Sequence, residues 1–369
     1  MDGQNLDFSC FTFQEATIEE RYQCWRSNSE SWAGKLSVED HVAREEWNGK
    51  QSLTRDGGQR YWVFKGPRYR GAQGETNIYS SVETLKKEVV LKFSDGTVKN
   101  TIAYGIASVF TAPEHRGKGV AAAMMERLGQ WLDGDEAGCE LSILYSDIGE
   151  YYARLGWPSY SSLEVILPST SNAPSIAIES LTTKTVKELA TDDVKRMNEK
   201  IISSPIPAGI DVLVGFLPTY SQAEWHFASE EFTASKLFND VRIPFVKGAM
   251  NTDTGVWAYW THDFNDNKLT ILRIHADSTT GDKLDPNNSC LQTSVVQILG
   301  AAQKEAHDWG LDKVVIWNPN TIVLAACAQI MGRDIAPRKR TDSSVPCLRW
   351  KRREEKKVSW YLIEKYSWC

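Results

Sequence analysis

The stretch SVFTAPEHRGKGVA, residues 108–121, decides how the rest of this chain is interpreted. An apolar run from Tyr104 to Phe110 leads into its basic turn and is typical of a buried strand. A helical pattern begins at Val120, with apolar side chains on one face. A turn between a strand and a helix start presents free backbone N–H groups and the positive end of the helix dipole to an anion, and Gly117 and Gly119 let that anion come close to the backbone. The stretch therefore predicts a binding site for a pyrophosphate group.

Two common phosphate-binding signatures do not fit this turn. A Walker loop needs Ser or Thr after its lysine, and a dinucleotide fingerprint needs a third glycine where Ala122 stands. What fits is Arg-x-x-Gly-x-Ala from Arg116 to Ala121, directly after a strand that ends in Thr-x-Pro. This pattern resembles motif A of the GNAT N-acyltransferases, which holds the pyrophosphate of acetyl-CoA. The resemblance implies that the cofactor is acetyl-CoA and that its binding residues are Val109, Phe110, Thr111, Arg116, Gly117, Lys118, Gly119, Val120 and Ala121.

A second motif of the same family follows in YYARLGW, residues 151–157. It resembles the element Y-x-[KR]-L-G-[FW] at the far side of the cofactor, in a helix whose start Asp147 can cap. The resemblance places Tyr152 where a phenol often protonates the departing CoA thiolate; the alternative is that this side chain only packs there. A phenol with a pKa near ~10 suits donation to a thiolate whose conjugate acid has a pKa near ~8.5. The resemblance also implies a cofactor contact at Ser146.

The base that deprotonates the acceptor amine is open between several carboxylates. An alkylammonium group with a pKa near ~10.4 must lose a proton before its nitrogen attacks a thioester. Glu83 is the first candidate, with a packing role as the alternative, and Asp147, Glu150 and the C-terminal carboxylate follow. A backbone N–H on the strand Val109–Thr111 would stabilise the oxyanion. No cysteine–histidine arrangement supports a covalent acyl-enzyme, so we expect direct transfer in a ternary complex.

The composition excludes several classes of protein. The chain has 369 residues and a net charge of −6, which argues against a general nucleic-acid binder. The seven cysteines are scattered and form no C-x-x-C pair, as is typical of reduced thiols in a cytoplasmic protein. The six histidines are dispersed, so we expect no metal site, and no apolar run approaches the ~18 residues of a membrane span.

The pattern along the chain predicts two related halves. The first ~110 residues read as a mostly antiparallel sheet, with a hairpin turn at residues 94–96. The spacing from the start of a predicted helix to the start of the next predicted strand is 19 residues both from Val120 and from Val295. We therefore predict an α/β GNAT acyltransferase fold with a mixed sheet in residues 1–167, a linker at 168–175, and a second, degenerate GNAT-like domain at 176–369 that covers the acceptor side. The loop at 282–289 lacks motif A, so we do not expect the second half to bind CoA. The aromatic end, from Val358, reads as a buried strand.

Taken together, the chain resembles the fungal LYC1-like lysine acetyltransferases. The residues that carry this likeness include SVET at 81–84, HRGKGVA at 115–121, YSDIG at 145–149 and the end EKYSWC at 364–369. The resemblance implies a small-molecule, lysine-like primary amine as acceptor, bound near Trp25 and Trp32 of the early helix and near Cys369. The tryptophans are alternatively core residues. Two other functions stay open, namely acetylation of a different small amine such as a secondary-metabolite intermediate, and a non-catalytic acyl-CoA-binding or interaction module. We expect a monomer with no nucleic-acid or membrane partner.

Overall fold

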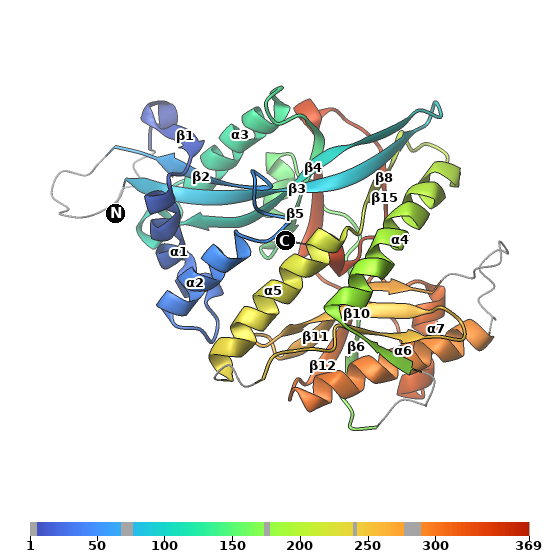
Figure 1. Ribbon diagram of the computed structural model, residues 1–369. Coiled ribbons are helices and arrows are strands. Elements are labelled where there is room, and N and C mark those ends of the chain that lie inside the picture. Colours follow the sequence, from blue (N-terminus) through green and yellow to red (C-terminus); the bar gives the residue numbers. More distant parts are fainter. Residues whose placement is uncertain (1–5, 68–76, 173–177, 239–241, 277–288, 369) are drawn as a thin grey trace.

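A computed structural model describes residues 6–67, 77–172, 178–238, 242–276 and 289–368 (Figure 1). These residues form two mixed β-sheets, one of eight strands and one of seven. Helix α3 lies on one face of the first sheet, α6 and α7 lie on the outer side of the second, and α4 and α5 occupy the region where the two sheets meet (Figure 1). None of the described helices is both long and apolar enough to cross a membrane.

The first sheet is antiparallel over the first four strands of the chain, as predicted. In spatial order it contains β1 (Thr12–Glu15), β2 (Gln59–Lys65), β3 (Ile78–Phe93), β4 (Val98–Thr111), β5 (Cys139–Ser146) and β14 (Val345–Trp350), with β8 (Val212–Phe216) on β3 and β15 (Val358–Tyr361) on β8. The predicted hairpin turn joins β3 to β4, and Asp95 accepts a hydrogen bond of 2.8 Å from the backbone N–H of Thr97. Gly96 has φ +89°, a conformation that glycine adopts without strain.

Helices α1 (Ile18–Trp32) and α2 (Val38–Asn48) cover one side of this sheet, and α3 (Val120–Asp133) connects β4 to β5. A capping box starts α1, because Thr17 accepts from the N–H of Glu20 while the Glu20 side chain accepts from the N–H of Thr17. Gly119 precedes α3 in a left-handed conformation, with φ +79°. The apolar face of α3 is buried through Val120, Met124 and Leu128. The strand, turn and helix predicted around residues 108–121 are therefore confirmed.

The second half repeats this plan. Its sheet contains β13 (Arg338–Lys339), β6 (Leu163–Pro168), β12 (Lys313–Trp317), β11 (Lys268–His275), β10 (Trp257–Asp263), β9 (Gly248–Asn251) and β7 (Ile178–Leu181), in that order. Its helices are α4 (Thr183–Ser203), α5 (Tyr220–Leu237), α6 (Ser289–Asp308) and α7 (Thr321–Met331). Strands β11 and β12 are parallel and joined by α6, just as β4 and β5 are parallel and joined by α3. The predicted second GNAT-like unit is thus present, while residues 282–288 of the predicted loop at 282–289 lie outside the described residues.

The two halves exchange strands: β6 of the first half joins the second sheet, and β8, β14 and β15 of the second half join the first. β6 precedes the predicted linker but pairs with β12 of the second sheet, and β14 follows it but pairs with β5 of the first. A cut at residues 168–175 therefore does not separate the two sheets; residues 173–175 of that segment lie outside the described part. One hydrophobic core also runs through both halves, since Leu91 of β3, Trp257 of β10 and Trp360 of β15 belong to the same buried cluster.

Two local predictions need correction. The helix expected after Asp147 is a 3₁₀ segment, η3 (Gly149–Leu155), without a side-chain cap, because Asp147 instead accepts a hydrogen bond of 2.7 Å from the N–H of Ser344. The C-terminal strand ends at Tyr361, where Leu362 takes φ +53°, and a second 3₁₀ segment, η5 (Lys365–Ser367), follows. The burial expected for this end is confirmed by Trp360, Tyr366 and Ser367.

Candidate active site

Strands β4 and β5 separate at the point where the motif begins. Their parallel pairing ends at Ile106 and Leu144, although β4 continues to Thr111 and β5 to Ser146. β14 pairs with β5 along its other edge, over Leu141–Ser146. The strand ends are therefore free to border a cavity, and residues 106–109 of β4 and 144–145 of β5 line one.

A bulge in β4 lies at this opening. Ser81 pairs with Phe110 and Glu83 with Ala107, so β4 has one more residue than β3 between the two pairs. Ser108 takes φ +52°, which is uncommon for a residue with a side chain. A bulge interrupts the ladder, so backbone N–H groups near Ser108 and Val109 can turn toward a ligand. This is the stretch in which an oxyanion contact was predicted.

The cavity has a volume of about 900 Å³ and takes its walls from both halves of the chain. The first half contributes the strand ends, the C-terminal end of α1 and one side of α2. The second half contributes α5, the ends of β10 and β11, and the C-terminal segment. Carboxylates outnumber cations on its walls: the acidic lining residues are Glu45, Glu83, Asp147, Glu230, Asp263, Asp266 and Asp342, and the Lys and Arg residues are Arg44, Lys268 and Lys365.

Glu83 lies on the β3 wall of this cavity. It is buried, and it accepts a hydrogen bond of 2.8 Å from the side-chain amide of Gln59. Burial, and then the nearby Glu45 carboxylate, raise the pKa of Glu83 from 4.5 to about 8, although hydrogen bonds from Gln59 and Ser108 oppose the shift. A carboxyl with this pKa accepts a proton near neutral pH far more readily than an exposed glutamate does. The predicted base therefore lies on the cavity with a pKa suited to that role.

Tyr152 reaches the same cavity from η3. It is buried, and burial raises the pKa of its phenol above the ordinary value, so the group keeps its proton at all physiological pH values. The segment ends at Gly156, which has φ +102° as a C-cap should. The structure thus brings Glu83 and Tyr152 together on the walls of one cavity, on either side of the β4–β5 opening.

The predicted pyrophosphate turn lies exposed at the start of α3. The Nε of Arg116 donates to the carbonyl of Thr111 at 3.0 Å, and its guanidinium pairs with Glu30 of α1. The Lys118 ammonium donates to the carbonyl of Glu114 at 2.8 Å. Gly117 has φ +73°, and a Cβ there would contact nothing within 4 Å. The first turn of α3 leaves backbone N–H groups without helical partners, so this turn can accept an anion.

The other residues that were predicted to contact a ligand lie in different parts of the structure. Trp32 lines the cavity beside Phe110, with ring centroids 5.9 Å apart. Trp25 does not lie on the cavity wall, because it packs in the core against Tyr61 of β2 at 5.5 Å. The Ser146 hydroxyl donates to the carbonyl of Gly149 at 2.8 Å and thus holds the β5–η3 turn. The predicted acceptor contact at Cys369 lies outside the described residues.

Sequence reasoning placed the second half over the acceptor side but did not identify the residues that it contributes to the cavity wall. Glu230 of α5 accepts hydrogen bonds from the Lys247 ammonium at 2.6 Å and from the Thr261 hydroxyl at 2.9 Å, and its carboxylate lies 3.0 Å from Nδ1 of His262. His226 of α5 lines the cavity with a buried Nε2 that has no hydrogen-bond partner among the described residues. A buried imidazole that contacts a pocket has no sequence signature, because its neighbours come from distant segments.

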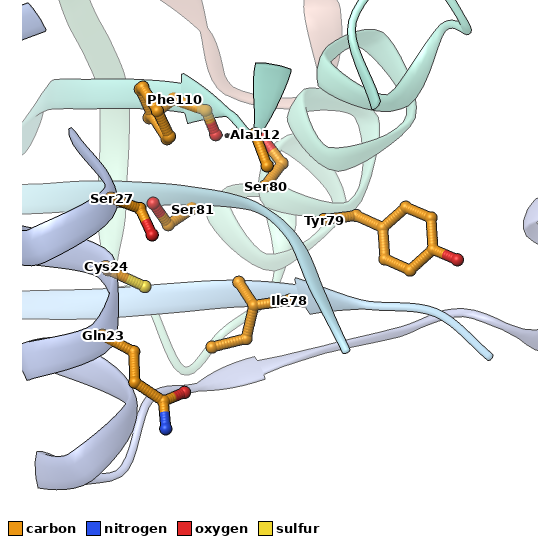
Figure 2. Close-up of a pocket in the computed structure, with 9 residues that line it drawn as sticks. All are labelled: Gln23, Cys24, Ser27, Ile78, Tyr79, Ser80, Ser81, Phe110 and Ala112. Atoms are coloured by element: carbon orange, nitrogen blue, oxygen red, sulfur yellow. Dashed lines mark hydrogen bonds between the residues drawn. The ribbon is translucent and has the colours of Figure 1, made fainter. Parts of the chain in front are cut away.

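A second, smaller pocket lies between α1 and the ends of β3 and β4. Figure 2 shows Cys24 and Ser27 of α1 beside Ser81 of β3, with Phe110 nearby. Its volume of about 20 Å³ has room for about one water molecule. Burial raises the pKa of the Cys24 thiol to about 12, so this cysteine stays protonated and unreactive. None of its lining residues lines the large cavity, which is therefore the candidate active site.

Comparison with known proteins identifies the family. Residues 164–369 match the family model described as the LYC1 GNAT-like C-terminal domain, and residues 15–159 match that of the acetyltransferase (GNAT) domain. The chain belongs to the LYC1-like GNAT family. It is an acyltransferase of the tandem GNAT type, as its sequence predicted.

Relatives of this LYC1-like GNAT protein extend over nearly its full length. A lysine acetyltransferase of Yarrowia lipolytica is 24% identical over 97% of this chain and 100% of its own, and an uncharacterized protein of Saccharomyces cerevisiae is 23% identical over 86% and 85%. Among solved structures, S. cerevisiae N-myristoyltransferase superposes with a TM-score of 0.57 at 11% identity, covering 96% of this chain and 82% of that one. A tandem GNAT protein from the clavulanic acid biosynthesis pathway gives 0.50 at 10% identity, covering 92% and 98%. At these identities the solved structures support the fold alone.

Proposed function

We propose that this LYC1-like enzyme transfers the acetyl group of acetyl-CoA directly to an amine of a small, lysine-like molecule. The observation that carries the proposal is the cavity between the two halves, onto which both Glu83 and Tyr152 open. A volume of about 900 Å³ lies within the range of small-molecule sites. The lysine acetyltransferase of Y. lipolytica, similar over the full length, supports an amine of lysine type.

The residues present fit acetyl-CoA. Arg116, Lys118 and the backbone N–H groups at the start of α3 would hold the pyrophosphate, and the opening between β4 and β5 would receive the thioester arm. When bound, acetyl-CoA supplies the acetyl group, whose carbonyl carbon forms the new C–N bond as the C–S bond breaks. The bulge at Ser108 and Val109 offers a backbone N–H for the oxygen that becomes negative during this exchange.

Two side chains of this protein carry out the proton transfers. Glu83 takes the proton that the amine must lose, and its raised pKa of about 8 brings its proton affinity closer to that of an alkylammonium. Tyr152 donates its phenolic proton to the leaving sulfur, because burial keeps the phenol neutral. Starting from the ammonium, the acceptor nitrogen loses two protons: Glu83 takes the first before attack, and the second returns to the Tyr152 phenolate, whose own proton has gone to the sulfur. One proton is then released to solvent from Glu83, and no covalent acyl-enzyme forms.

The walls of the cavity favour a small acceptor over a protein. Side chains of both halves of one chain surround it, and α2 packs against α5 across the junction. The proposed catalytic unit is therefore a single chain. The excess of carboxylates on the walls suits a cationic acceptor, so lysine, ornithine and other small amines are the first acceptors to compare.

The test is acetyl-CoA turnover, followed by thiol release, with a panel of free lysine, ornithine, polyamines, aromatic amines and a histone peptide. Saturable turnover with lysine supports the proposal. Turnover confined to a larger amine would retain the mechanism and replace the substrate. Acetyl-CoA binding without turnover on any amine would indicate a binding module, and turnover of the peptide alone would overturn the small-molecule assignment.

A further inference from the structure

One cation on the cavity wall lacks the carboxylate partner that the others have. Arg44 donates two hydrogen bonds to Glu45, at 3.1 and 2.8 Å, and Lys268 lies 2.5 Å from Asp266. Lys365, in η5, forms no ion pair with any described residue, although its side chain lines the cavity. An ammonium group with unused hydrogen-bond donors therefore faces the cavity.

Aromatic rings hold this ammonium in place. Its Nζ lies 3.3 Å from the ring centroid of Trp368 and 4.6 Å from that of Trp317. Cation–π contacts of this kind favour a cation over a neutral group, but they leave the N–H donors unsatisfied. The indoles thus fix the position of Lys365 without neutralising its charge.

A second buried cation contacts the same Trp317 ring as Lys365, although it does not line the cavity. The guanidinium of Arg340 lies 3.6 Å from the Trp317 ring centroid, and Arg340 is only 5% exposed. Its Nε, Nη1 and Nη2 have no hydrogen-bond partner among the described residues. A buried arginine without partners is costly, so an anion beside it would be bound strongly. Burial, together with neighbouring cations that include Lys268 and Arg340, holds the pKa of Lys365 well below its usual value, and a nearby anion would reverse that effect.

The segment that carries Lys365 is fixed from both halves. The Tyr145 hydroxyl of β5 lies 2.6 Å from the Ser367 hydroxyl, and the Tyr366 hydroxyl donates to the carbonyl of Phe216 at 2.7 Å. Arg273 of β11 donates to the buried Glu364 carboxylate at 3.2 Å. The ammonium is therefore held in place before a ligand arrives, which lowers the entropy cost of binding.

Lys365 and Glu83 both line the cavity but come from different halves of the chain. Glu83 belongs to β3 of the first sheet, whereas Lys365 packs against Trp317 at the end of β12 in the second. We propose that Lys365, supported by Arg340, binds the carboxylate of the acceptor, so that the acceptor is an amino acid whose amine reaches the β4–β5 opening. The assignment rests on the proposed function and adds the residues that would distinguish an amino acid from a simple diamine.

The experiment compares free lysine with 1,5-diaminopentane, which lacks only the carboxylate, in the wild type and in Lys365→Met. Thiol release gives KM and kcat for both amines. A charge-assisted hydrogen bond lost from a buried site corresponds to roughly a 10- to 100-fold rise in KM. We expect this rise for lysine, with KM for the diamine changed less than about twofold. Lys365→Arg, which keeps the cation, should retain most of the preference for lysine, and Arg340→Met should weaken it in part.

Several results would overturn the assignment. Equal changes for both amines in Lys365→Met would show that the residue does not sense the carboxylate, and a rise in the KM for acetyl-CoA alone would assign the cation to a CoA phosphate. Met replaces a charge that lacks an ion pair with an apolar chain of similar length, so the variant should keep its fold, which thermal unfolding checks. If the wild type turns over no amine, the proposed function fails, and calorimetric titration of lysine decides the subsite separately. Equal affinity of the wild type and Lys365→Met for lysine would then refute it.

Discussion

Glu83 should destabilise the folded protein at neutral pH, and Glu83→Gln should remove that cost. Burial raises the pKa of this carboxyl from 4.5 to about 8, so the folded state binds a proton that the unfolded state releases between these values. Stability falls with rising pH wherever the native state binds more protons, by about 1.4 kcal/mol for each pH unit. The full penalty, present above pH 8 and absent below pH 4.5, approaches about 5 kcal/mol. The side-chain amide that the substitution introduces cannot ionise and carries no such penalty.

The assay is urea unfolding of the wild type and Glu83→Gln at pH 5.5, 6.5 and 7.5, followed by tryptophan fluorescence. The stability of the variant should rise by about 3 kcal/mol relative to that of the wild type between the first and last pH. Glu88→Gln is the matched control, because Glu88 lies exposed on the same strand, and its curve should stay parallel to that of the wild type. Parallel curves for Glu83→Gln would refute the reasoning, since they would mean that Glu83 titrates alike in both states.

The same titration should appear in catalysis. If Glu83 is the base, kcat of the wild type rises with pH through about 8, and Glu83→Gln loses this dependence together with roughly 10²–10⁴-fold in rate. A more stable but inactive variant is the outcome expected when a buried group is kept for chemistry at a cost in stability.

Three further predictions concern the acid, the turn and the second sheet. Tyr152→Phe should lower kcat about 100-fold and leave the KM for acetyl-CoA unchanged in thiol-release assays, whereas an unchanged kcat would indicate a packing role. Arg116→Gln should raise the KM for acetyl-CoA. Glu30→Gln frees the same guanidinium and should lower this KM, by at most about fivefold because the ion pair is exposed. A rise in KM for both variants would contradict the assigned site. Gly248→Ala should lower stability to thermal unfolding by about 1–3 kcal/mol, since its Cβ would lie 2.4 Å from a backbone oxygen of β10. Gly300→Ala should raise stability by up to about 1 kcal/mol, because a Cβ at that helix position meets nothing within 4 Å. Equal effects would contradict the packing described for β9.

Local patterns made the first half predictable. The turn at residues 108–121 has a strand before it and an amphipathic helix after it, and each of these signals is contained within about ten residues. The capping box at Thr17 and the Asp-Gly hairpin at residues 95–96 are equally local. Such features are set by neighbouring residues, so the sequence determines them without knowledge of the rest of the fold.

The tryptophans of α1 show where local reasoning ends. Trp25 and Trp32 are seven residues apart and so lie on the same face of the helix. Trp25 nevertheless packs against Tyr61 in the core, while Trp32, two turns later, borders the cavity. The helix passes from the body of the sheet to the opening between β4 and β5. The spacing of its apolar residues gives no indication of that change.

The exchange of β6 and β14 explains why the cavity wall was harder to foresee than the fold. An apolar strand pattern specifies which face of a strand is buried but not which sheet it joins, and these two short strands join the sheet of the other half. Because each sheet contains a strand of the other half, the halves cannot separate without breaking β-ladder hydrogen bonds. The walls that carry Glu83 and Lys365 are consequently parts of one folded body. A site that must hold an amine on one wall and a carboxylate on the other needs this fixed separation, and the strand exchange supplies it.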